Sequence, residues 1–195
     1  MRLDHIAFRT KNRLKTAQFF VDTLKYSIQQ EFTIDFGNNE TAQCLVLEPP
    51  EKQIKGVDWV NFHNVQNPLI PPWNTENYNG PSEQFQEYHL APEIFVSDGS
   101  PGSIVANWVD ARGGIGGIHH MAYQVKNVEE TMKEWKEKGY AEFTSDKPMS
   151  CENLIQAFTK PSTLTGIIFE LIERGEDGFC RDNVKQLMES TRHLK

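Results

Sequence analysis

The sequence predicts an α+β fold built from two related modules that share one core. The main observation is an internal repeat: LDHIAFRTKNRLKTAQFFVDTLKY, near the N-terminus, returns as IHHMAYQVKNVEETMKEWKEKGY in the second half. One constant shift places His5 on His120 and Ala7 on Ala122. In each copy, strand-like alternation is followed by apolar residues at helical spacing. A histidine at the same place in two related strands predicts one metal site shared across a pseudo-twofold axis.

Length and charge narrow the class of protein. The chain has 195 residues, which is one domain by length or two small modules with a common core. No run approaches the roughly 20 apolar residues of a membrane span, and the N-terminus lacks the apolar core of a signal peptide. The net charge of -7 argues against a nucleic-acid partner, because no basic stripe can offset phosphate.

The cysteines are odd in number and far apart. Cys44, Cys151 and Cys180 form neither a CxxC pair nor a pattern from which a disulfide framework can be drawn. We therefore expect reduced thiols with structural roles and a cytoplasmic protein.

Module one is predicted to span 1–112. Alternation in its first strand places Leu3, His5 and Ala7 on one face, and a Gly-Asn-Asn turn separates two later β-prone stretches. Its expected elements are strands at 3–9, 27–35, 41–47 and 93–97, a helix at about 13–24 and a short helix at 104–109.

An insertion within module one, 51–91, differs in character from the rest of the chain. It contains four isolated or paired prolines after position 67, many Asn and Gln residues, and several aromatic residues. A structureless loop of this length is unusual in a small domain. The aromatic residues favour packing as a lid or as a contact between subunits, and we expect a homodimer.

Module two is predicted to span 113–175 and opens with the flexible GGIGG link. A last amphipathic helix, at about 181–193, lies within a terminal segment 178–195. The other expected elements are strands at 117–125, near 140–144, at 153–159 and at 166–173, and a helix at about 128–138.

Three polar residues lie on strands that should be buried: His5, His120 and Glu170. Glu170 interrupts the apolar run GIIFELI, and a buried carboxylate without a partner costs several kcal/mol. Two neutral imidazoles and one carboxylate, with coordination positions left over, are typical of non-haem Fe(II) oxygenases. The alternative is that each histidine is a satisfied core residue and Glu170 pairs with a lysine or an arginine.

His119 precedes His120 directly. Neighbouring side chains on a regular strand point to opposite faces, so only one of the two should face the metal. The repeat selects His120 as the ligand. We expect His119 to make a hydrogen bond or to reach the rim of the pocket.

Three segments carry a resemblance to a known family: GGIGGIHHMA, LIQAFTKP and IFELIER. They resemble the vicinal-oxygen-chelate superfamily, in which paired βαβββ modules form a curled mixed sheet around a metal. More narrowly, they resemble the C-terminal, metal-binding half of the 4-hydroxyphenylpyruvate dioxygenases. The resemblance implies Fe(II) held by His5, His120 and Glu170; such ligands also accept Zn, Mn, Co or Ni.

The resemblance also implies a substrate pocket, closed by the C-terminal helix of 178–195 as a gate. The family usually has glutamine where this chain has His119, and this chain lacks the family's N-terminal half, so the substrate stays open. The residues expected at the substrate are Gln156, Phe158, Phe179, Asn183, Ser97 and His119.

The candidate ligands and the family resemblance are compatible with three functions. The first is an Fe(II)-dependent dioxygenase that uses O2 and an aromatic 2-oxo acid, most simply 4-hydroxyphenylpyruvate, to give homogentisate and carbon dioxide. The second is a metal-dependent isomerase, lyase or epimerase, whose usual fourth protein ligand would be Glu93. The third is a metal-free module that binds a small ligand. Three protein ligands favour the first function, and four favour the second.

Overall fold

The computed structural model describes residues 1–50, 91–151, 154–174 and 179–194, so the predicted insertion falls almost entirely outside the described residues. The described residues form an eight-stranded mixed sheet with four helices. The elements are β1 (Arg2–Arg9), α1 (Arg13–Leu24), β2 (Ser27–Gly37), β3 (Glu40–Glu48), β4 (Glu93–Gly99), α4 (Ile104–Asp110), β5 (Gly117–Gln124), α5 (Val128–Glu137), β6 (Met149–Cys151), β7 (Leu154–Phe158), β8 (Ile168–Glu173) and α6 (Arg181–Ser190).

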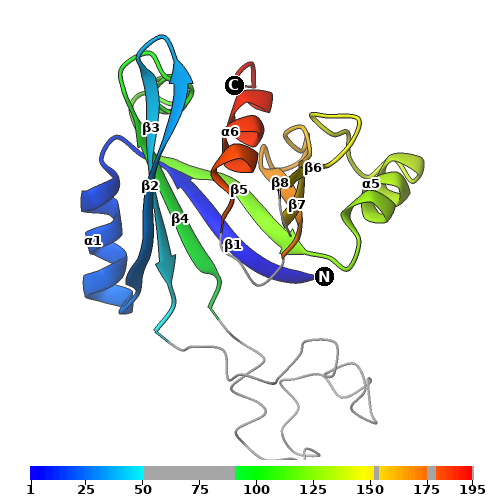
Figure 1. Cartoon of the computed structure of the whole chain (residues 1–195), viewed down its shortest axis with the longest axis horizontal. Coiled ribbons are helices and arrows are strands. Elements are labelled where there is room, and N and C mark those ends of the chain that lie inside the picture. The colour runs from blue at the N-terminus through cyan, green and yellow to red at the C-terminus, as the bar shows by residue number, and fades with distance from the viewer. Residues whose placement is uncertain (51–90, 152–153, 175–178, 195) are drawn as a thin grey trace, which may run out of the picture. The chain divides into compact units, whose positions relative to one another are not determined.

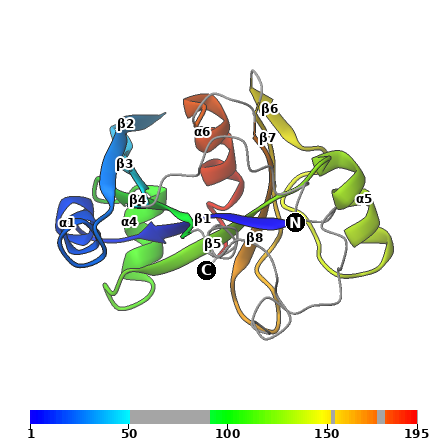
Figure 2. The ribbon, with the colours of Figure 1, turned by 90° about the horizontal axis from the view of Figure 1, so that it is seen from below.

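The order of strands in the sheet is symmetric about its centre. It runs β2-β3-β4-β1-β5-β8-β7-β6, so each module contributes the same βαβββ unit. β1 pairs with β4 in parallel and β5 with β8 in parallel, while the two modules meet through the antiparallel pair β1 and β5. In Figure 2 the helix α1 and the outer strands of module one lie on the left, and α5 and the outer strands of module two lie on the right. The predicted fold class is confirmed.

The two repeat helices also begin in the same way. The side chain of Asn12 accepts a hydrogen bond from the Lys15 backbone, and Asn127 accepts one from the Glu130 backbone, each at 2.9 Å. Both asparagines are N-caps, which satisfy backbone N–H groups that have no partner within the helix. The repeat seen in the sequence therefore extends to local hydrogen bonding.

Helices cover both faces of the sheet. Ala17 of α1 packs with Leu45 and Ile94 on one face, and Val128 of α5 begins the corresponding cluster in module two. On the other face α6 lies between the two modules, where Val184 packs in a cluster with Ala7 (Figure 1). This second face, with α4 and α6, contains the candidate site.

One predicted strand is wrong. The segment near 140–144 makes only an isolated bridge, Phe143 to Thr159, and the edge strand of module two is β6 instead. With only three residues, β6 is too short for its alternation to be recognised in the sequence. Within the described residues, no helix is long and apolar enough to cross a membrane.

The cysteines also differ from the expectation. Cys151 at the end of β6 and Cys180 at the start of α6 form a disulfide, whereas Cys44 is free and buried. Sequence spacing gave no pairing because the two residues meet only through the packing of α6 beside β6. The disulfide ties the first turn of that helix to the sheet.

Candidate metal centre

The two central strands each carry a β-bulge beside their histidine. In the pairing of β1 with β5, Leu3 faces Tyr123 and His5 faces Ala122. β1 advances by two residues while β5 advances by one, so Asp4 is the extra residue. A bulge allows two consecutive side chains to leave the strand on similar sides, and both Asp4 and His5 are buried.

The second bulge lies on β5 at the equivalent place in the repeat. Ala7 faces His120 and Phe8 faces Ile118, so His119 is the extra residue. His119 and His120 are both buried, and their Nδ1 atoms lie 2.8 Å apart. The expectation that alternation would turn His119 to the opposite face is therefore wrong, although the expected hydrogen bond is present.

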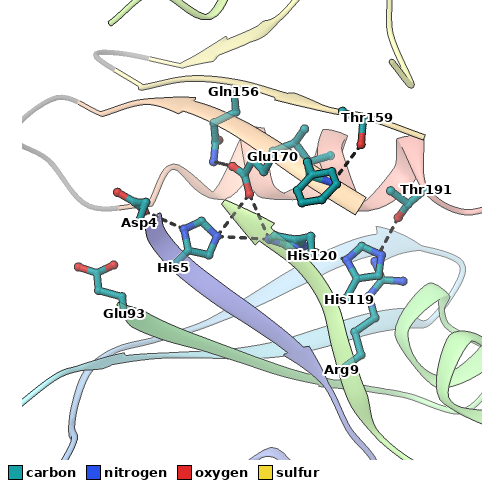
Figure 3. A network of polar contacts seen from close by, with 12 residues as sticks. Asp4, His5, Arg9, Glu93, His119, His120, Gln156, Thr159, Glu170 and Thr191 are labelled. Carbon is teal, nitrogen blue, oxygen red and sulfur yellow. Dashed lines mark hydrogen bonds and ion pairs between the residues drawn. The ribbon is translucent and has the colours of Figure 1, made fainter. Parts of the chain in front are cut away.

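His5, His120 and Glu170 converge on one point (Figure 3). The Nε2 atoms of His5 and His120 are 3.2 Å apart. Glu170 Oε2 lies 3.3 Å from His5 Nε2 and 3.1 Å from His120 Nε2. All three side chains are buried, and they come from three adjacent strands, β1, β5 and β8.

This triangle has the dimensions of one face of a metal coordination sphere. Ligand atoms at about 2.0–2.1 Å from a metal, with angles near 90°, are roughly 3 Å apart. The three measured separations are close to that value, and one oxygen and two imidazole nitrogens form the donor set. The His-His-Glu group can therefore hold a divalent metal ion.

The electrostatics agree with a cation site. Burial alone would raise the pKa of Glu170, but the nearby His5 and His120 hold the pKa of this carboxyl well below its ordinary value. Burial alone would lower the pKa of His5, but the charge of Glu170 and the hydrogen bond with Asp4 raise it to about 9. Burial lowers the pKa of His120. Glu170 is thus a buried anion, as a cation site requires.

Each ligand candidate is oriented by a second residue. His5 Nδ1 lies 2.8 Å from Asp4, and Arg174 donates to both Asp4 oxygens, at 2.7 and 3.1 Å. Glu170 Oε1 accepts a hydrogen bond from Gln156 at 2.5 Å. With Nδ1 of His5 bonded to Asp4, its Nε2 faces the centre of the triangle and would coordinate a metal that displaces its proton, as in metal sites whose histidines donate to a carboxylate.

The repeat identifies the position where a fourth ligand would stand. Glu170 on β8 pairs with Ala122 on β5, and the equivalent partner of Ala7 on β4 is Phe95. Phe95 is buried, with its ring centroid 6.4 Å from that of His5. An apolar ring therefore occupies the place in module one that the carboxylate occupies in module two.

Glu93, considered as a fourth ligand, lies elsewhere. It pairs with His5 along the strands, two residues before Phe95, and its carboxylate accepts a hydrogen bond from Arg174 at 2.8 Å. It is outside the group of side chains that can hold one ion. Among the described residues, the site offers three ligands.

A cavity of about 30 Å³ adjoins the triangle. It has room for an ion and ordered water but not for an organic substrate. Phe158 and Phe179 form two of its walls, with ring centroids 4.7 Å from His120 and 5.0 Å from His5. Of the residues expected at the substrate, those that line this cavity are Gln156, Phe158, Phe179, Ser97 and His119.

Asn183 does not line the cavity. Its buried amide donates to the backbone carbonyls of Leu154 and Met149, at 3.2 and 3.5 Å, and so joins α6 to β6 and β7. Asn183 therefore makes structural contacts, and the substrate contact expected of it stays a prediction. The side chain of Phe169 packs toward Tyr123, away from the cavity, because Phe169 neighbours the inward Glu170 on a regular strand.

Replacing Asp4 by asparagine should weaken metal binding by about 10- to 100-fold, because the carboxylate no longer orients His5 or increases its basicity. Competition with a fluorescent chelator measures this change. Asp98→Asn is the control, since Asp98 also accepts from an arginine but lies outside the site. Equal metal affinity in Asp4→Asn and the wild type would contradict this role.

Comparison with known proteins supports the fold. No protein-family model and no curated protein matches the sequence. Among solved structures, a methylmalonyl-CoA epimerase matches at 16% identity and a TM-score of 0.60, covering 90% of this chain and 97% of that one. The epimerase from Mycobacterium tuberculosis matches at 15% identity and 0.58, covering 89% and 88%.

A mutant of 4-hydroxymandelate synthase from Streptomyces coelicolor matches at 16% identity with a TM-score of 0.67. The match covers 98% of this chain but 53% of the synthase, so this chain corresponds to about half of that protein. Identities at this level show a shared fold. Together with the symmetric sheet of two βαβββ units, they show that the chain has the vicinal-oxygen-chelate fold.

Proposed function

We propose that this protein is an Fe(II)-dependent dioxygenase acting on an aromatic 2-oxo acid. The observation that carries the proposal is the count of ligand candidates: His5, His120 and Glu170 form one face, and Phe95 stands at the fourth position. Three protein ligands leave three positions on an octahedral ion, enough for a bidentate 2-oxo acid and O2. A Zn, Mn, Co or Ni ion would fit the same donors.

Iron bound there would supply the one-electron chemistry that allows O2 to react with a 2-oxo acid. The protein's residues hold and shield the reacting centre. Gln156 fixes Glu170 through one oxygen, while its own Oε1 is buried without a partner and can accept a hydrogen bond from a substrate. Phe158 and Phe179 exclude water and offer aromatic faces to a substrate ring. With 4-hydroxyphenylpyruvate the products would be homogentisate and carbon dioxide.

The helix α6 would act as the gate of this site. Three of its apolar residues, Val184, Leu187 and Met188, line the cavity, which is too small for an organic molecule. A substrate therefore needs these side chains to move. Ser97 and His119 also line the cavity and are proposed substrate contacts; a homodimer and a cytoplasmic location stay predictions.

An epimerase is the second candidate, because several of the structural neighbours are methylmalonyl-CoA epimerases. Such a reaction moves a proton at the carbon next to a carbonyl, and it needs a base within reach of that carbon. Among the described residues that line the cavity, the carboxylate Glu170 is used by the metal site, and His119 is a weak base because burial holds the pKa of its imidazole well below the ordinary value. The geometry therefore favours the dioxygenase.

One experiment separates the two candidates. Protein loaded anaerobically with Fe(II) is mixed with phenylpyruvate or 4-hydroxyphenylpyruvate, and the visible spectrum and later O2 uptake are recorded. The dioxygenase proposal expects a charge-transfer band and O2 uptake. In parallel, methylmalonyl-CoA is incubated with the metal-loaded protein in D2O. Exchange of its α-proton without any band or O2 uptake would replace the dioxygenase by the epimerase.

Replacing Phe95 by glutamate should add the missing ligand. The new carboxylate would stand at the position equivalent to Glu170, so the variant should bind Ni(II) or Zn(II) more tightly than the wild type. It should lose the charge-transfer band, because fewer open positions remain for a 2-oxo acid. Phe95→Gln is the control of similar size without charge. Unchanged metal affinity and an unchanged band in Phe95→Glu would refute the assignment of this position.

A further inference from the structure

A second polar group in the cavity has no role in holding the metal. Arg9 extends from the end of β1 on the same side as His5 and Ala7, and it lines the cavity although it is only 3% exposed. Its Nη2 donates to Thr191 Oγ1 at 3.1 Å, and that hydroxyl donates to the Met188 carbonyl at 2.8 Å. These bonds fix the guanidinium at the C-terminal end of α6. Its Nη1 is buried with no hydrogen-bond partner.

The charge of Arg9 is not neutralised within the described residues. Burial lowers the pKa of Arg9 to about 9, which still leaves it charged at neutral pH. The nearby Cys44 offers no anion, because burial raises the pKa of its thiol to about 12. No described carboxylate forms an ion pair with Arg9, and the negative end of the α6 dipole offers only partial compensation. An uncompensated buried cation is costly.

A second unsatisfied donor belongs to His119. A metal on Nε2 of His120 leaves the proton of that imidazole on Nδ1, which therefore donates to Nδ1 of His119. The proton of the neutral His119 ring must then be on its Nε2. This atom is buried and without a hydrogen-bond partner. Metal binding by His120 thus makes Nε2 of His119 a hydrogen-bond donor.

Both donors belong to one part of the cavity. Arg9 and His119 both line it, and both lie against Trp108, at 5.9 Å for the Arg9 guanidinium and 5.7 Å for the His119 ring centroid. Figure 3 shows the two side chains beside each other, on the side of His120 away from His5. A cation and an N–H group, both lacking an acceptor, form a site complementary to a carboxylate.

We propose that Arg9 and His119 bind an anionic group at the end of the substrate remote from the metal, so that the substrate is a 2-oxo acid with a second carboxylate. This inference rests on the proposed function and names its substrate class. Four residues of strand separate Arg9 from His5, which is roughly 13 Å along the backbone. The proposed substrate is therefore an aromatic 2-oxo acid with its second carboxylate on the far side of the ring. The ring would lie against the apolar side chains of α6 that line the cavity, once these have moved to admit it.

The test compares two ligands that differ by one carboxylate, phenylpyruvate and 4-carboxyphenylpyruvate. Their dissociation constants are measured by calorimetry on anaerobic Fe(II)-loaded protein. The wild type should bind 4-carboxyphenylpyruvate about ten- to a hundred-fold more tightly, as expected for a charged hydrogen-bonded pair. Arg9→Met should lose this preference while its affinity for phenylpyruvate stays within about two-fold. Arg9→Lys should keep part of the preference, because lysine retains the positive charge but lacks the paired N–H donors of the planar guanidinium.

Arg112→Met is the matched control. Arg112 also lies over Trp108, at 4.2 Å, but it is exposed and does not line the cavity. This variant should bind both ligands as the wild type does. Loss of the preference in Arg112→Met, or its retention in Arg9→Met, would overturn the inference. So would equal affinities for the two ligands in the wild type.

Stability without ligand gives an independent readout. If Arg9 serves binding, its buried charge should destabilise the protein while no ligand is bound. Arg9→Met, which lacks this charge, should then unfold at a higher temperature than the wild type in the absence of any 2-oxo acid. A lower unfolding temperature would assign Arg9 a structural role and overturn the inference. The proposed function fails separately: its failure would be the absence of a charge-transfer band with either 2-oxo acid, whatever preference the calorimetry reports.

Discussion

Glu170→Ala is expected to lower the affinity for Fe(II) by more than about 100-fold, because it removes a ligand itself. Losing a residue that only orients a ligand typically costs about 10- to 100-fold. The carboxylate contributes the only negative charge of the triangle, and its Oε2 lies within 3.3 Å of both imidazoles. Metal analysis of protein dialysed against a weak chelator should find about one ion per wild-type chain and none in the variant. Oxygen uptake with a 2-oxo acid should disappear with the metal.

A change in folding could also remove the metal, so stability must be followed as well. Wild-type protein should gain about 2.7 kcal/mol in free energy of unfolding when free Fe(II) is 100 times its dissociation constant. The variant should gain nothing at the same concentration. Glu142→Gln, an exposed carboxylate paired with Lys160, is the control and should respond as the wild type does. Full metal content in folded Glu170→Ala would remove this residue from the site.

Reduction of the Cys151–Cys180 disulfide is expected to lower the free energy of unfolding by roughly 3 to 4 kcal/mol, given the 29-residue separation that it closes. The measurement is a urea titration of wild-type protein with and without a thiol reductant. Because Cys180 is the N-cap residue of α6, the loss should be accompanied by faster proteolysis near this helix.

Two variants control for effects of the reductant itself. Cys151→Ser should have the stability of the reduced wild type and should not respond to reductant. Cys44→Ala changes the free, buried cysteine and should remain sensitive to reductant, with only a packing loss of its own. A wild type whose unfolding midpoint is identical in both conditions would show that the bond contributes no stability.

The sequence was most informative where the repeat was strongest. The shift that aligns His5 with His120 predicted the two central strands, and the apolar run around Glu170 predicted a third strand with one polar residue. These three residues meet because they lie on adjacent strands, which the paired modules require. The role of these residues as metal ligands stays a prediction that the geometry supports.

The features that sequence reasoning missed depend on irregular or distant packing. The orientation of His119 follows from a bulge, and the phase shift that it causes falls between two histidines, where the apolar alternation gives no sign of it. Arg9 continues the alternation of His5 and Ala7, so its inward direction was available from the sequence, but its lack of a partner was not. The disulfide and the placement of Asn183 both arise from the position of α6, which no local pattern specifies.

The two bulges have a consequence for how the halves of the chain come together. One bulge residue, Asp4, lies on β1 and the other, His119, lies on β5. Shifting the register between the two strands would therefore separate each bulge from the residues that now pair around it. Only one alignment accommodates both. A module donated by a second copy of the chain would have to dock in that same alignment, and would then rebuild the same trio of donor atoms across two molecules.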